Sequence, residues 1–438
     1  MRVLVIGTGA REHAIVQRLA SERDVTEIVA APGNPGISAL ARTRPVDMTS
    51  PDAPAAIDAL ADLEQIDFTI IGPELPLSLG VADRLAANGR LVFGPTKGAA
   101  RLESSKAFAK AFMQRHHVPT ARFETCESAE AALAAVRAGT FGFPVVLKAD
   151  GLAAGKGVVI AHTRAVAESA IASMMSARRF GDAGSRVVIE ECLTGLEVSF
   201  FVVSYGARAL PIGTAQDHKR IFDDDQGPNT GWMGAFAPSP LITRELHLQV
   251  MREIVDPVIA GMAAEGCPFR GFLYVGLMLT PAGPKVIEFN VRLGDPEAQV
   301  ILPLIDEPLL PILVAAASGS LRQSSCRIST ERLVGVVLAS RGYPDTADSG
   351  QPISGIAEAE RLPGVSVCHA GTAMRERELV TAGGRVLTVV GRGPDYSVAI
   401  ARAYAGVLQI HFDGMQYRKD IGRKALQLPD HQITRSPN

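Results

Sequence analysis

Short apolar runs alternate with helical patterns through the first hundred residues, and this alternation constrains the fold more than any other feature of the chain. The apolar runs lie at residues 2–6, 26–31, 67–72 and 91–95. Strands that alternate with helices at this spacing predict a parallel, doubly wound sheet. Such sheets bind ligands beyond the carboxyl ends of their strands. The turns GTGARE, APGNPG and GPELP, which lie at those ends, are therefore candidate parts of a binding site.

The pattern changes after about residue 103. Strands then follow one another through short, hairpin-like connections, as in RVVIEECL, EVSFFVVSYG and ARALPIG. A helical pattern near 243–264 precedes two more strands, GFLYVGLMLT and PKVIEFNVR, and another helical pattern lies near 395–410. We therefore expect a mixture of α/β and α+β domains. Their predicted ranges are 1–103, 104–324 and 325–426, followed by a polar tail over 427–438 that we expect to be disordered.

Composition excludes several classes of protein. A length of 438 residues, with 47% hydrophobic and 21% charged residues, is typical of a soluble protein of several domains. The net charge of -2 argues against nucleic acid as a partner, and no apolar run approaches the roughly 18–20 residues that span a bilayer. The start MRVLVIGTG predicts a strand and a turn, not a signal peptide. Five scattered cysteines without a CxxC pair indicate reduced thiols. We expect a cytoplasmic protein with no membrane partner.

The turn GTGARE only partly matches the dinucleotide-binding fingerprint. Glu12 stands where that fingerprint has its third glycine, and the strand at 26–31 ends without the acid that would bind a ribose. A nicotinamide cofactor is therefore disfavoured. Gly7 and Gly9 would still place backbone N–H groups at a helix N-terminus, which suits a phosphate, and Arg11 could add a charged fork. A tight turn without a ligand is the alternative.

The segment KADGLAAGKGVVI combines two lysines with a glycine-rich turn. Lys148 ends a predicted strand, and Lys156 lies in the turn. The segment is not a P-loop, because Gly157 follows the second lysine where that motif needs Ser or Thr. Two strands joined in this way could fold over a triphosphate while the lysines screen its charge. A plain glycine-rich hairpin is the alternative.

The segment KVIEFNVRLGDPEAQ is the candidate metal site. Alternation along a strand places Glu288 and Asn290 on one face and Phe289 on the other. Carboxylate and amide oxygens are hard ligands, which suit a Mg²⁺ ion that also binds nucleotide phosphates. Arg292 would share that face and could meet an anion. A solvated strand edge is the alternative, but it would not explain an acid among bulky apolar residues.

The polar stretch HKRIFDDDQGPNTGWMGAF, at residues 218–236, fits neither a core strand nor an amphipathic helix. Together with the glycine turn and the acid–amide strand, it indicates an acceptor pocket beside a nucleotide site. We expect its acidic run, Asp223–Asp225, to be a solvated loop tip. No Ser/His/Asp or Cys/His arrangement is evident in the sequence, so covalent catalysis by a protein nucleophile is disfavoured.

Five motifs in this order resemble the glycinamide ribonucleotide synthetase (phosphoribosylamine–glycine ligase) family of ATP-grasp enzymes. The motifs are IGTGAREHA, LKADGLAAGKGV, DHKR…GPNTGWMGA, IEFNVRLGDPE and HAGT, and the resemblance extends from Met1 to residue 426. It implies a doubly wound N-terminal domain, an ATP-grasp domain of two subdomains with a mobile lid over about 121–192, and a small mixed C-terminal domain. It also implies a monomer that joins glycine to 5-phosphoribosylamine through a glycyl phosphate, with ATP cleaved to ADP and phosphate, in purine biosynthesis.

The resemblance also implies ligands, position by position. For ATP these are Lys106, Lys148, Gly151, Gly155, Lys156 and Gly157, with Glu190, Glu191, Cys192 and Leu193 as an adenine-binding hinge and Glu197 near the ribose. For phosphoribosylamine they are Gly9, Arg11, Glu12, Asn34 and Gly36. For the amine and glycine side they are Asp217, His218, Lys219, Asn229 and Thr230, closed by Arg292, Gly294 and Asp295. Asp217, Lys219 and Arg292 are the predicted catalytic residues, and Glu288 and Asn290 would hold Mg²⁺ or Mn²⁺.

The chain departs from this family at a few positions. Trp232 stands where the family usually has glycine, Phe222 lies where small residues are usual, and Ala10 replaces another glycine. The indole could reshape access for glycine or could point outward. Three other functions are weighed against the ligase. They are a nicotinamide oxidoreductase, a non-catalytic nucleotide-binding relative, and an ATP-grasp carboxylate–amine ligase with a changed acceptor.

Overall fold

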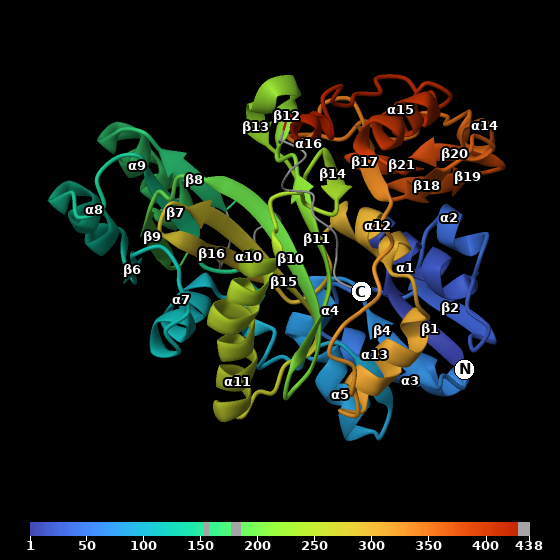
Figure 1. The fold of residues 1–438 in the computed structure, drawn as a ribbon, viewed down its shortest axis with the longest axis horizontal. Helices are drawn as coiled ribbons and strands as arrows, with labels where there is room; N and C mark the ends of the chain where they lie inside the picture. The colour runs from blue at the N-terminus through green and yellow to red at the C-terminus, as the bar shows by residue number, and fades with distance from the viewer. Residues whose placement is uncertain (153–156, 177–184, 428–438) are drawn as a thin grey trace.

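A computed structural model describes residues 1–152, 157–176 and 185–427 of the chain (Figure 1). Two predicted ATP ligands, Gly155 and Lys156, lie outside the described residues, as does the predicted tail from Leu428 onward. Within the described ranges, no helix is long and apolar enough to cross a membrane.

The N-terminal region is a five-stranded parallel sheet in the order β3-β2-β1-β4-β5. Its elements are β1 (Arg2–Gly7), α1 (Ala10–Ala20), β2 (Glu27–Pro32), α2 (Pro35–Ser38), β3 (Arg42–Thr43), α3 (Ala53–Leu63), β4 (Phe68–Ile71), α4 (Glu74–Leu79), α5 (Val81–Ala87) and β5 (Leu91–Phe93). In β1, Val3 and Val5 pack towards α1, whereas Leu4 and Ile6 pack towards α3 and α5. Because helices cover both faces, the predicted doubly wound sheet is confirmed. Gly80 adopts a left-handed conformation between α4 and α5 and separates these two helices.

An eight-stranded sheet forms the centre of the molecule, in the order β16-β15-β10-β11-β14-β17-β21-β18 (Figure 1). Its strands are β10 (Leu196–Tyr205), β11 (Ala209–Asp217), β14 (Gly234–Ala237), β15 (Arg270–Thr280), β16 (Gly283–Asn290), β17 (Arg332–Ala339), β18 (Val365–His369) and β21 (Arg385–Gly393). The pairing of β14 with β17, in which Gly234 lies opposite Val336, joins the central part of the chain to its last third. The hairpins predicted from EVSFFVVSYG–ARALPIG and GFLYVGLMLT–PKVIEFNVR are both confirmed.

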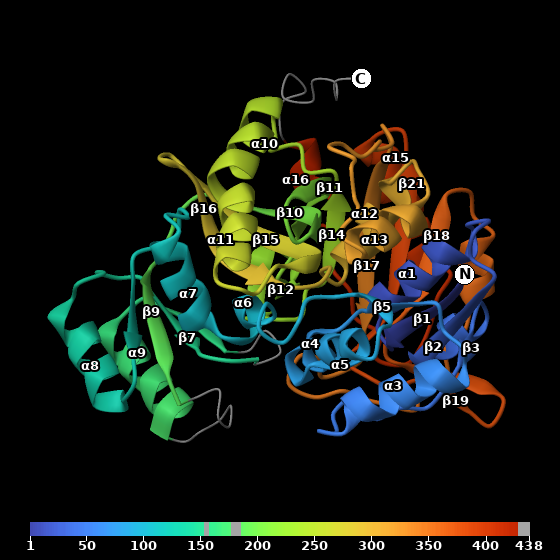
Figure 2. The same ribbon diagram turned by 90° about the horizontal axis from the view of Figure 1, so that it is seen from below.

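A four-stranded sheet in the order β6-β9-β7-β8 forms a separate lobe (Figure 2). Its elements are β6 (Phe123–Cys126), α8 (Ala129–Ala138), β7 (Val145–Ala149), β8 (Val158–Ala161), α9 (Arg164–Ile171), a π-helical turn (Ala172–Ser176) and β9 (Val187–Glu191). The apolar side chains of α8, α9 and this sheet make a core of their own, which includes Val136, Leu147 and Ile189. The lobe therefore has the packing of an independent unit.

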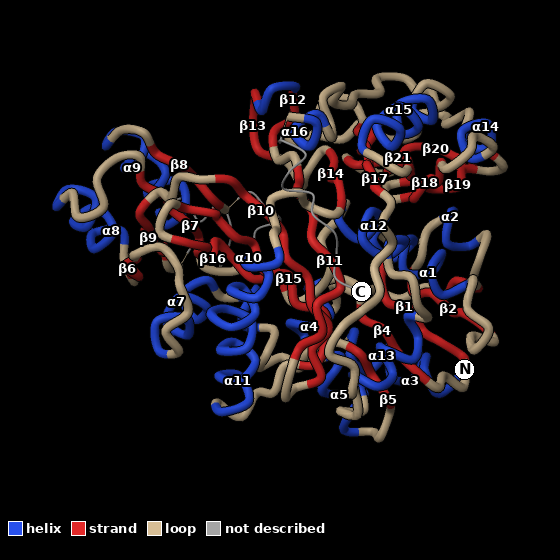
Figure 3. Tube along the Cα trace, in the orientation of Figure 1, coloured by secondary structure: helices blue, strands red, loops and turns tan. Residues whose placement is uncertain are grey.

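The remaining elements cover these sheets (Figure 3). They are α6 (Arg101–Ser104), α7 (Lys106–Arg115), β12 (Arg220–Phe222), a 3-10 turn (Asp223–Asp225), β13 (Gln226–Asn229), α10 (Arg244–Val250), a π-helical turn (Met251–Val255), α11 (Asp256–Ala264), α12 (Glu297–Ile301), a 3-10 turn (Leu302–Leu304), α13 (Leu309–Ala317), α14 (Ile356–Glu360), β19 (Thr372–Arg375), β20 (Glu378–Thr381), α15 (Tyr396–Val407) and α16 (Arg423–Leu426). The helical pattern predicted at 243–264 is therefore helical throughout, with a π-helical turn in its middle.

The acidic run at 223–225 differs from its prediction. Asp225 accepts hydrogen bonds from Arg418 Nη1 at 2.8 Å and from Lys424 Nζ at 2.7 Å. The backbone N–H of Lys419 donates to Asp223 at 2.7 Å. Asp224, whose side chain is 79% exposed, is solvated as expected, but Asp223 and Asp225 also dock the β12–β13 hairpin onto the C-terminal segment.

Candidate active site

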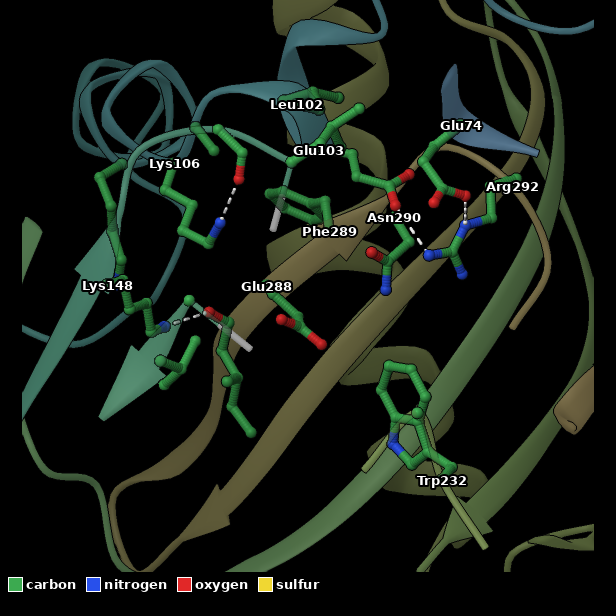
Figure 4. Close-up of a pocket in the computed structure, with 18 of the residues that line it drawn as sticks. Glu74, Leu102, Glu103, Lys106, Lys148, Trp232, Glu288, Phe289, Asn290 and Arg292 are labelled. Carbon is green, nitrogen blue, oxygen red and sulfur yellow. Dashed lines mark hydrogen bonds and ion pairs between the residues drawn. The ribbon is translucent and has the colours of Figure 1, made fainter. Parts of the chain in front are cut away.

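A cavity of about 270 Å³ opens where the N-terminal sheet, the four-stranded lobe and the central sheet meet (Figure 4). Its lining includes many of the predicted ligands: Arg11, Lys106, Lys148, Gly151, Gly157, Glu190, Glu288, Asn290, Arg292 and Asp295. It also includes charged residues that the sequence did not indicate: Glu74, Glu103, Lys110 and Arg385. The cavity therefore collects groups from segments that lie up to 374 residues apart, from Arg11 to Arg385.

Lysines gather at the end of the cavity beside the lobe. Ser105 caps α7 by accepting a hydrogen bond from the N–H of Phe108 at 3.1 Å, which places Lys106 in the first turn. Lys106 Nζ donates to the carbonyl of Gly151 at 2.8 Å. Lys148 and Lys110 bind the two carboxylate oxygens of Glu190, at 3.0 and 2.9 Å. Burial lowers the pKa of Lys110 to about 8 in spite of this carboxylate. Two cations around one buried acid leave positive charge facing the cavity.

The predicted adenine hinge, residues 190–193, begins with the last two residues of β9. Both edges of β9 pair with neighbouring strands as far as Glu191, so its backbone is already hydrogen-bonded. The carboxylate of Glu191 binds Arg122 at 2.8 Å, and hydrogen bonds from Arg122 outweigh burial and lower the pKa of Glu191 to about 2. Among the described residues, backbone that could meet a base begins only at Cys192 and Leu193, which do not line the cavity.

Glu288 and Asn290 lie side by side on β16 and point into the cavity (Figure 4). Phe289 also borders the cavity, although its ring is almost fully buried. Within the described part of the chain, no hydrogen bond or ion pair engages the Glu288 carboxylate or the Asn290 amide. Two unengaged hard oxygens suit Mg²⁺. No group of three His, Cys, Asp or Glu residues in the described ranges could hold a metal ion, so the remaining ligands of such an ion would come from phosphates and water.

Arg292 lies beyond the end of β16 between two acids, the nearly buried Glu103 and the partly exposed Glu74. Its guanidinium binds Glu103 at 2.8 Å and Glu74 at 3.2 Å, as Figure 4 shows. Burial raises the pKa of Glu103 to about 7, although Arg292 opposes that rise. The pKa of Glu74 falls instead to about 2, because Arg292 and Arg11 outweigh its burial. Arg292 is thus fixed in direction before any substrate binds.

The turn at Gly9 holds a carboxylate of its own. Glu12 accepts a hydrogen bond from the N–H of Gly9 at 2.7 Å and one from Arg11 Nε at 2.5 Å. A side chain at Gly7 or Gly72 would overlap this carboxylate, which explains both glycines. The Gly9 amide is therefore not free for the phosphate that the turn was predicted to bind. Arg11 lines the cavity and also donates to the carbonyl of Leu293 at 3.1 Å.

Asn34 and Gly36 lie at a domain joint and not in the cavity lining. Asn34 Nδ2 donates to the carbonyls of Thr8 and His369 at 2.9 and 2.8 Å, and its Oδ1 accepts from the N–H of Ile37. A side chain at Gly36 would overlap the ring of His369. These contacts attach the N-terminal domain to the C-terminal domain, so the side chain of Asn34 has no free group for a substrate.

A second, small cavity of about 10 Å³ shares Glu288 with the first and is also lined by Asp217, Lys219, Glu197 and Tyr274. Lys219 forms an ion pair with Glu197, whose side chain is 44% exposed. Burial raises the pKa of Asp217 to about 6, although Lys219 opposes the rise. The predicted pair Asp217 and Lys219 is thus brought next to the metal strand.

Three other predicted ligands, His218, Asn229 and Thr230, line neither cavity. The ring of His218 points to the other side of the chain and packs against Phe236 at 5.9 Å between centroids. Burial lowers the pKa of His218 to about 3, so the ring is neutral at pH 7. Asn229 is exposed and pairs through its backbone with Arg220. Thr230 is buried, and its hydroxyl donates to the carbonyl of Lys219 at 2.9 Å.

The loop that follows Arg292 borders the main cavity at the end lined by Asp295 and Arg385. A side chain at Gly294 would overlap Glu297, a buried acid whose pKa is raised to about 8 by burial and by Asp217. Asp295 lines the cavity, and its backbone carbonyl accepts from Arg385 at 2.5 Å. Burial raises the pKa of Asp295, but the positive charges of Arg385 and Arg11 outweigh this effect. The pKa of Asp295 is therefore below its ordinary value, and this acid stays ionised.

Trp232 lines the cavity with its indole directed towards the β16 strand (Figure 4). The alternative that this side chain points outward is therefore wrong. Its φ of 77° is left-handed, a conformation that favours glycine.

Three domain models of one known protein family match consecutive parts of the chain. Residues 1–103 match the N domain of phosphoribosylglycinamide synthetase, residues 104–298 its ATP-grasp (A) domain, and residues 333–424 its C domain. The chain belongs to the phosphoribosylglycinamide synthetase family.

Individual members of the phosphoribosylglycinamide synthetase family agree with this assignment. A phosphoribosylamine–glycine ligase of Xylella fastidiosa is 49% identical, over 99% of this chain and all of the relative. One from Vibrio cholerae is 48% identical, over 97% of this chain and 99% of the relative. The crystal structure of phosphoribosylamine–glycine ligase from Thermotoga maritima superposes with a TM-score of 0.83 at 34% identity, covering 96% of this chain and 100% of that one.

A more distant structure shares the fold alone. Biotin carboxylase from Campylobacter jejuni has a TM-score of 0.74 at 17% identity, over 98% of this chain and 95% of that one. The expected fold, a doubly wound domain followed by an ATP-grasp region and a small C-terminal domain, is confirmed by the synthetase match and by these structures.

Proposed function

We propose that this protein is a phosphoribosylamine–glycine ligase. It joins glycine to 5-phosphoribosylamine in purine biosynthesis and cleaves ATP to ADP and phosphate. The observation that carries the proposal is the pair of unengaged oxygens on Glu288 and Asn290. They face a cavity that also holds Lys106 and Lys148, in a chain whose relatives are named phosphoribosylamine–glycine ligases.

The triphosphate of ATP lies, in this proposal, between Lys106 and Lys148 on one side and β16 on the other. Glu288 and Asn290 would hold Mg²⁺ or Mn²⁺, which when bound would neutralise charge on the phosphates. Gly151 and Gly157 border the same cavity and leave room for phosphate oxygens. The adenine reaches the backbone of Cys192 and Leu193, the first part of the hinge that no strand occupies.

The four-stranded lobe acts as the lid over this nucleotide. It carries Lys148 on β7 and Glu190 on β9, and it has its own apolar core, so it can move as a unit. Its joint with the central sheet includes the bridge between Thr120 and Val286. Closure would bring Lys148 onto the phosphates, opposite Lys106 on α7, and would exclude water from the reacting groups.

The reaction proceeds in two steps. A carboxylate oxygen of glycine attacks the γ-phosphorus of ATP, ADP leaves, and glycyl phosphate forms. The amine of phosphoribosylamine then attacks the acyl carbon, phosphate leaves, and the amide nitrogen loses a proton. Arg292, held by Glu74 and Glu103, stabilises the charge on the transferring phosphoryl group. Glu103 lines the same cavity, and its pKa of about 7 suits it to accept the proton.

The two acceptors enter from the end that the N-terminal and C-terminal domains share. Arg11, Arg385 and Asp295 border that end, and the two arginines provide charge for the 5-phosphate of phosphoribosylamine. Lys219 and Asp217 lie behind Glu288 and complete the glycine side. The balanced charge and scattered cysteines support a cytoplasmic enzyme that acts on small molecules, and we propose that it works as a monomer.

The test is ADP release by the purified protein with Mg²⁺, ATP, glycine and freshly generated phosphoribosylamine, each omitted in turn. We expect ADP only when both acceptors are present. Glu288→Ala should lower the rate at least about 100-fold, since it removes a charged metal ligand. Glu358→Ala, an exposed acid remote from the cavity, is the matched control and should leave the rate unchanged. ADP that required a different acid or amine would refute the substrates but keep the nucleotide site.

A further inference from the structure

The carboxylate of Asp217 lies at the end of β11 and, among the described residues, has no ion-pair partner. Its Oδ2 atom is shielded from solvent and has no hydrogen-bond partner. In the described part of the chain it forms no ion pair, and the ammonium of Lys219, whose charge lowers the pKa of Asp217 against the effect of burial, is bound to Glu197. A buried charge is costly unless a partner compensates it. A cavity that contains such a group is therefore suited to a ligand that carries a positive charge.

Trp232 lines the main cavity, whereas Asp217 lines the small cavity that shares Glu288 with it. Its backbone is held on both sides: the N–H of Trp232 donates to Thr230 Oγ1 at 2.9 Å, and that of Gly231 donates to the Tyr343 hydroxyl at 2.7 Å. These bonds fix a left-handed backbone that a bulky residue rarely adopts. The direction of the indole is therefore set by the loop.

The indole presents two chemical features at this place. Its ring lines the cavity beside Glu288 and Asn290 (Figure 4). Its N–H is buried without a hydrogen-bond partner, yet it lies close enough to Asp217 to lower the pKa of that carboxyl, against the burial that raises it. A ring face attracts a cation, and tryptophan does so more strongly than the other aromatic residues. Ring and carboxylate thus favour the same kind of ligand.

We propose that Trp232 and Asp217 form the binding site for the ammonium group of the amino-acid substrate. The ammonium lies against the indole ring and donates to Asp217 Oδ2, while the indole N–H orients the carboxylate. The pair distinguishes an amino acid from other small carboxylic acids, because only the amino acid has the cation. The inference rests on the proposed function, since it assigns one group of the proposed substrate glycine to two named residues.

Kinetics of three variants test the proposal. Trp232→Phe keeps a ring with a weaker π-face and loses the N–H, whereas Trp232→Leu loses both. We expect KM for glycine to rise about 5–10-fold in the first and more than about 30-fold in the second, with kcat within about twofold. Phe222→Ala changes an exposed aromatic residue ten positions before Trp232; it is the matched control and should leave KM unchanged.

Glycolate, which carries a hydroxyl in place of the ammonium, separates recognition from packing. As a competitive inhibitor against glycine, it should bind wild type and Trp232→Leu with inhibition constants within about twofold, because it never used the cation site. A purely structural role would weaken glycine and glycolate equally, and that result would overturn the proposal. An unchanged KM for glycine in Trp232→Leu would overturn it as well.

Fluorescence provides a readout that is independent of turnover, because Trp232 is the only tryptophan in the chain. With Mg²⁺ and a non-hydrolysable ATP analogue present, glycine should change the emission in a saturable way, and glycolate should change it much less. No response at saturating glycine in a protein that turns glycine over would refute the ammonium site alone. Wild-type protein that fails to turn glycine over would instead refute the proposed function.

Discussion

Arg418 is a fully buried arginine that joins the β12–β13 hairpin to the C-terminal domain. Its guanidinium binds Asp420 at 2.6 Å and Asp225 at 2.8 Å, and it donates to the carbonyl of Arg220 at 3.1 Å. The change Arg418→Met keeps most of the side-chain length and removes the charge. Asp420, which is 6% exposed, would then be buried without its cation.

The loss of stability follows from this geometry. Removing one partner of a buried ion pair costs about 3–5 kcal/mol. We expect a loss at the lower end of this range, about 3 kcal/mol at pH 7. The Asp225 side chain is 42% exposed, so solvent screens the ion pair between Arg418 and Asp225. At about 2–4 °C for each kcal/mol, the melting temperature should fall by about 6–12 °C.

The assay is thermal unfolding followed by circular dichroism, beside a control that makes the same change in the same domain. Arg341 binds Asp413 at 2.9 Å, but the two side chains are 61% and 66% exposed. Arg341→Met should therefore cost no more than about 1 kcal/mol. Equal shifts in the two variants would refute the reasoning, because burial would then have no bearing on what the pair contributes.

The pH dependence gives a second check on Arg418. Burial raises the pKa of Asp420, but the hydrogen bonds from Arg418 outweigh it and leave that pKa well below the ordinary value. A carboxyl with a lowered folded-state pKa stabilises the protein above the unfolded pKa, about 3.9, and this contribution is lost as pH falls through the folded pKa. The difference between wild type and Arg418→Met should be constant near neutral pH and should narrow below about pH 4.

Two further variants test other parts of the structure. Burial and Asp217 raise the pKa of Glu297 to about 8, so the folded protein keeps a proton that the unfolded chain releases, and wild-type stability falls as pH rises towards 8. Glu297→Gln should therefore gain stability relative to wild type between pH 5 and 8, and melting temperatures that differ by a constant amount would contradict this. Asn34→Ala removes three hydrogen bonds at the domain joint and should cost about 2–3 kcal/mol in urea unfolding, with KM for phosphoribosylamine unchanged. A raised KM with unchanged stability would instead restore Asn34 as a substrate ligand.

Local periodicity was sufficient for much of the fold and for part of the site. The period-two pattern of β16 places Glu288 and Asn290 together, and the structure has them so. The same rule applied to Asp217, His218 and Lys219 separates the histidine from its neighbours, as observed, but the family motif groups all three. Motif membership thus says that a residue matters, whereas strand alternation says which way it points.

Other features of the site depend on contacts between distant segments. Glu103 meets Arg292 from 189 residues away, and Arg385 reaches the Asp295 carbonyl from 90 residues away. No local pattern marks either residue, because each becomes part of the cavity only when separate domains pack. The contacts of Asn34 were not predicted for a related reason. A polar residue in a turn at the end of a strand suits a ligand, but here another domain takes up its hydrogen bonds.

The pairing of β14 with β17 limits how the domains of this family could have been exchanged during evolution. Three family units follow one another along the chain, yet backbone hydrogen bonds run without interruption from the second into the third. A recombination event that exchanged the C-terminal unit would have to supply a strand that matches Gly234–Ala237 in register, in addition to a compatible surface. The C-terminal unit is therefore inherited together with the strand it extends. The four-stranded lobe, whose strands pair only among themselves, is free of that constraint.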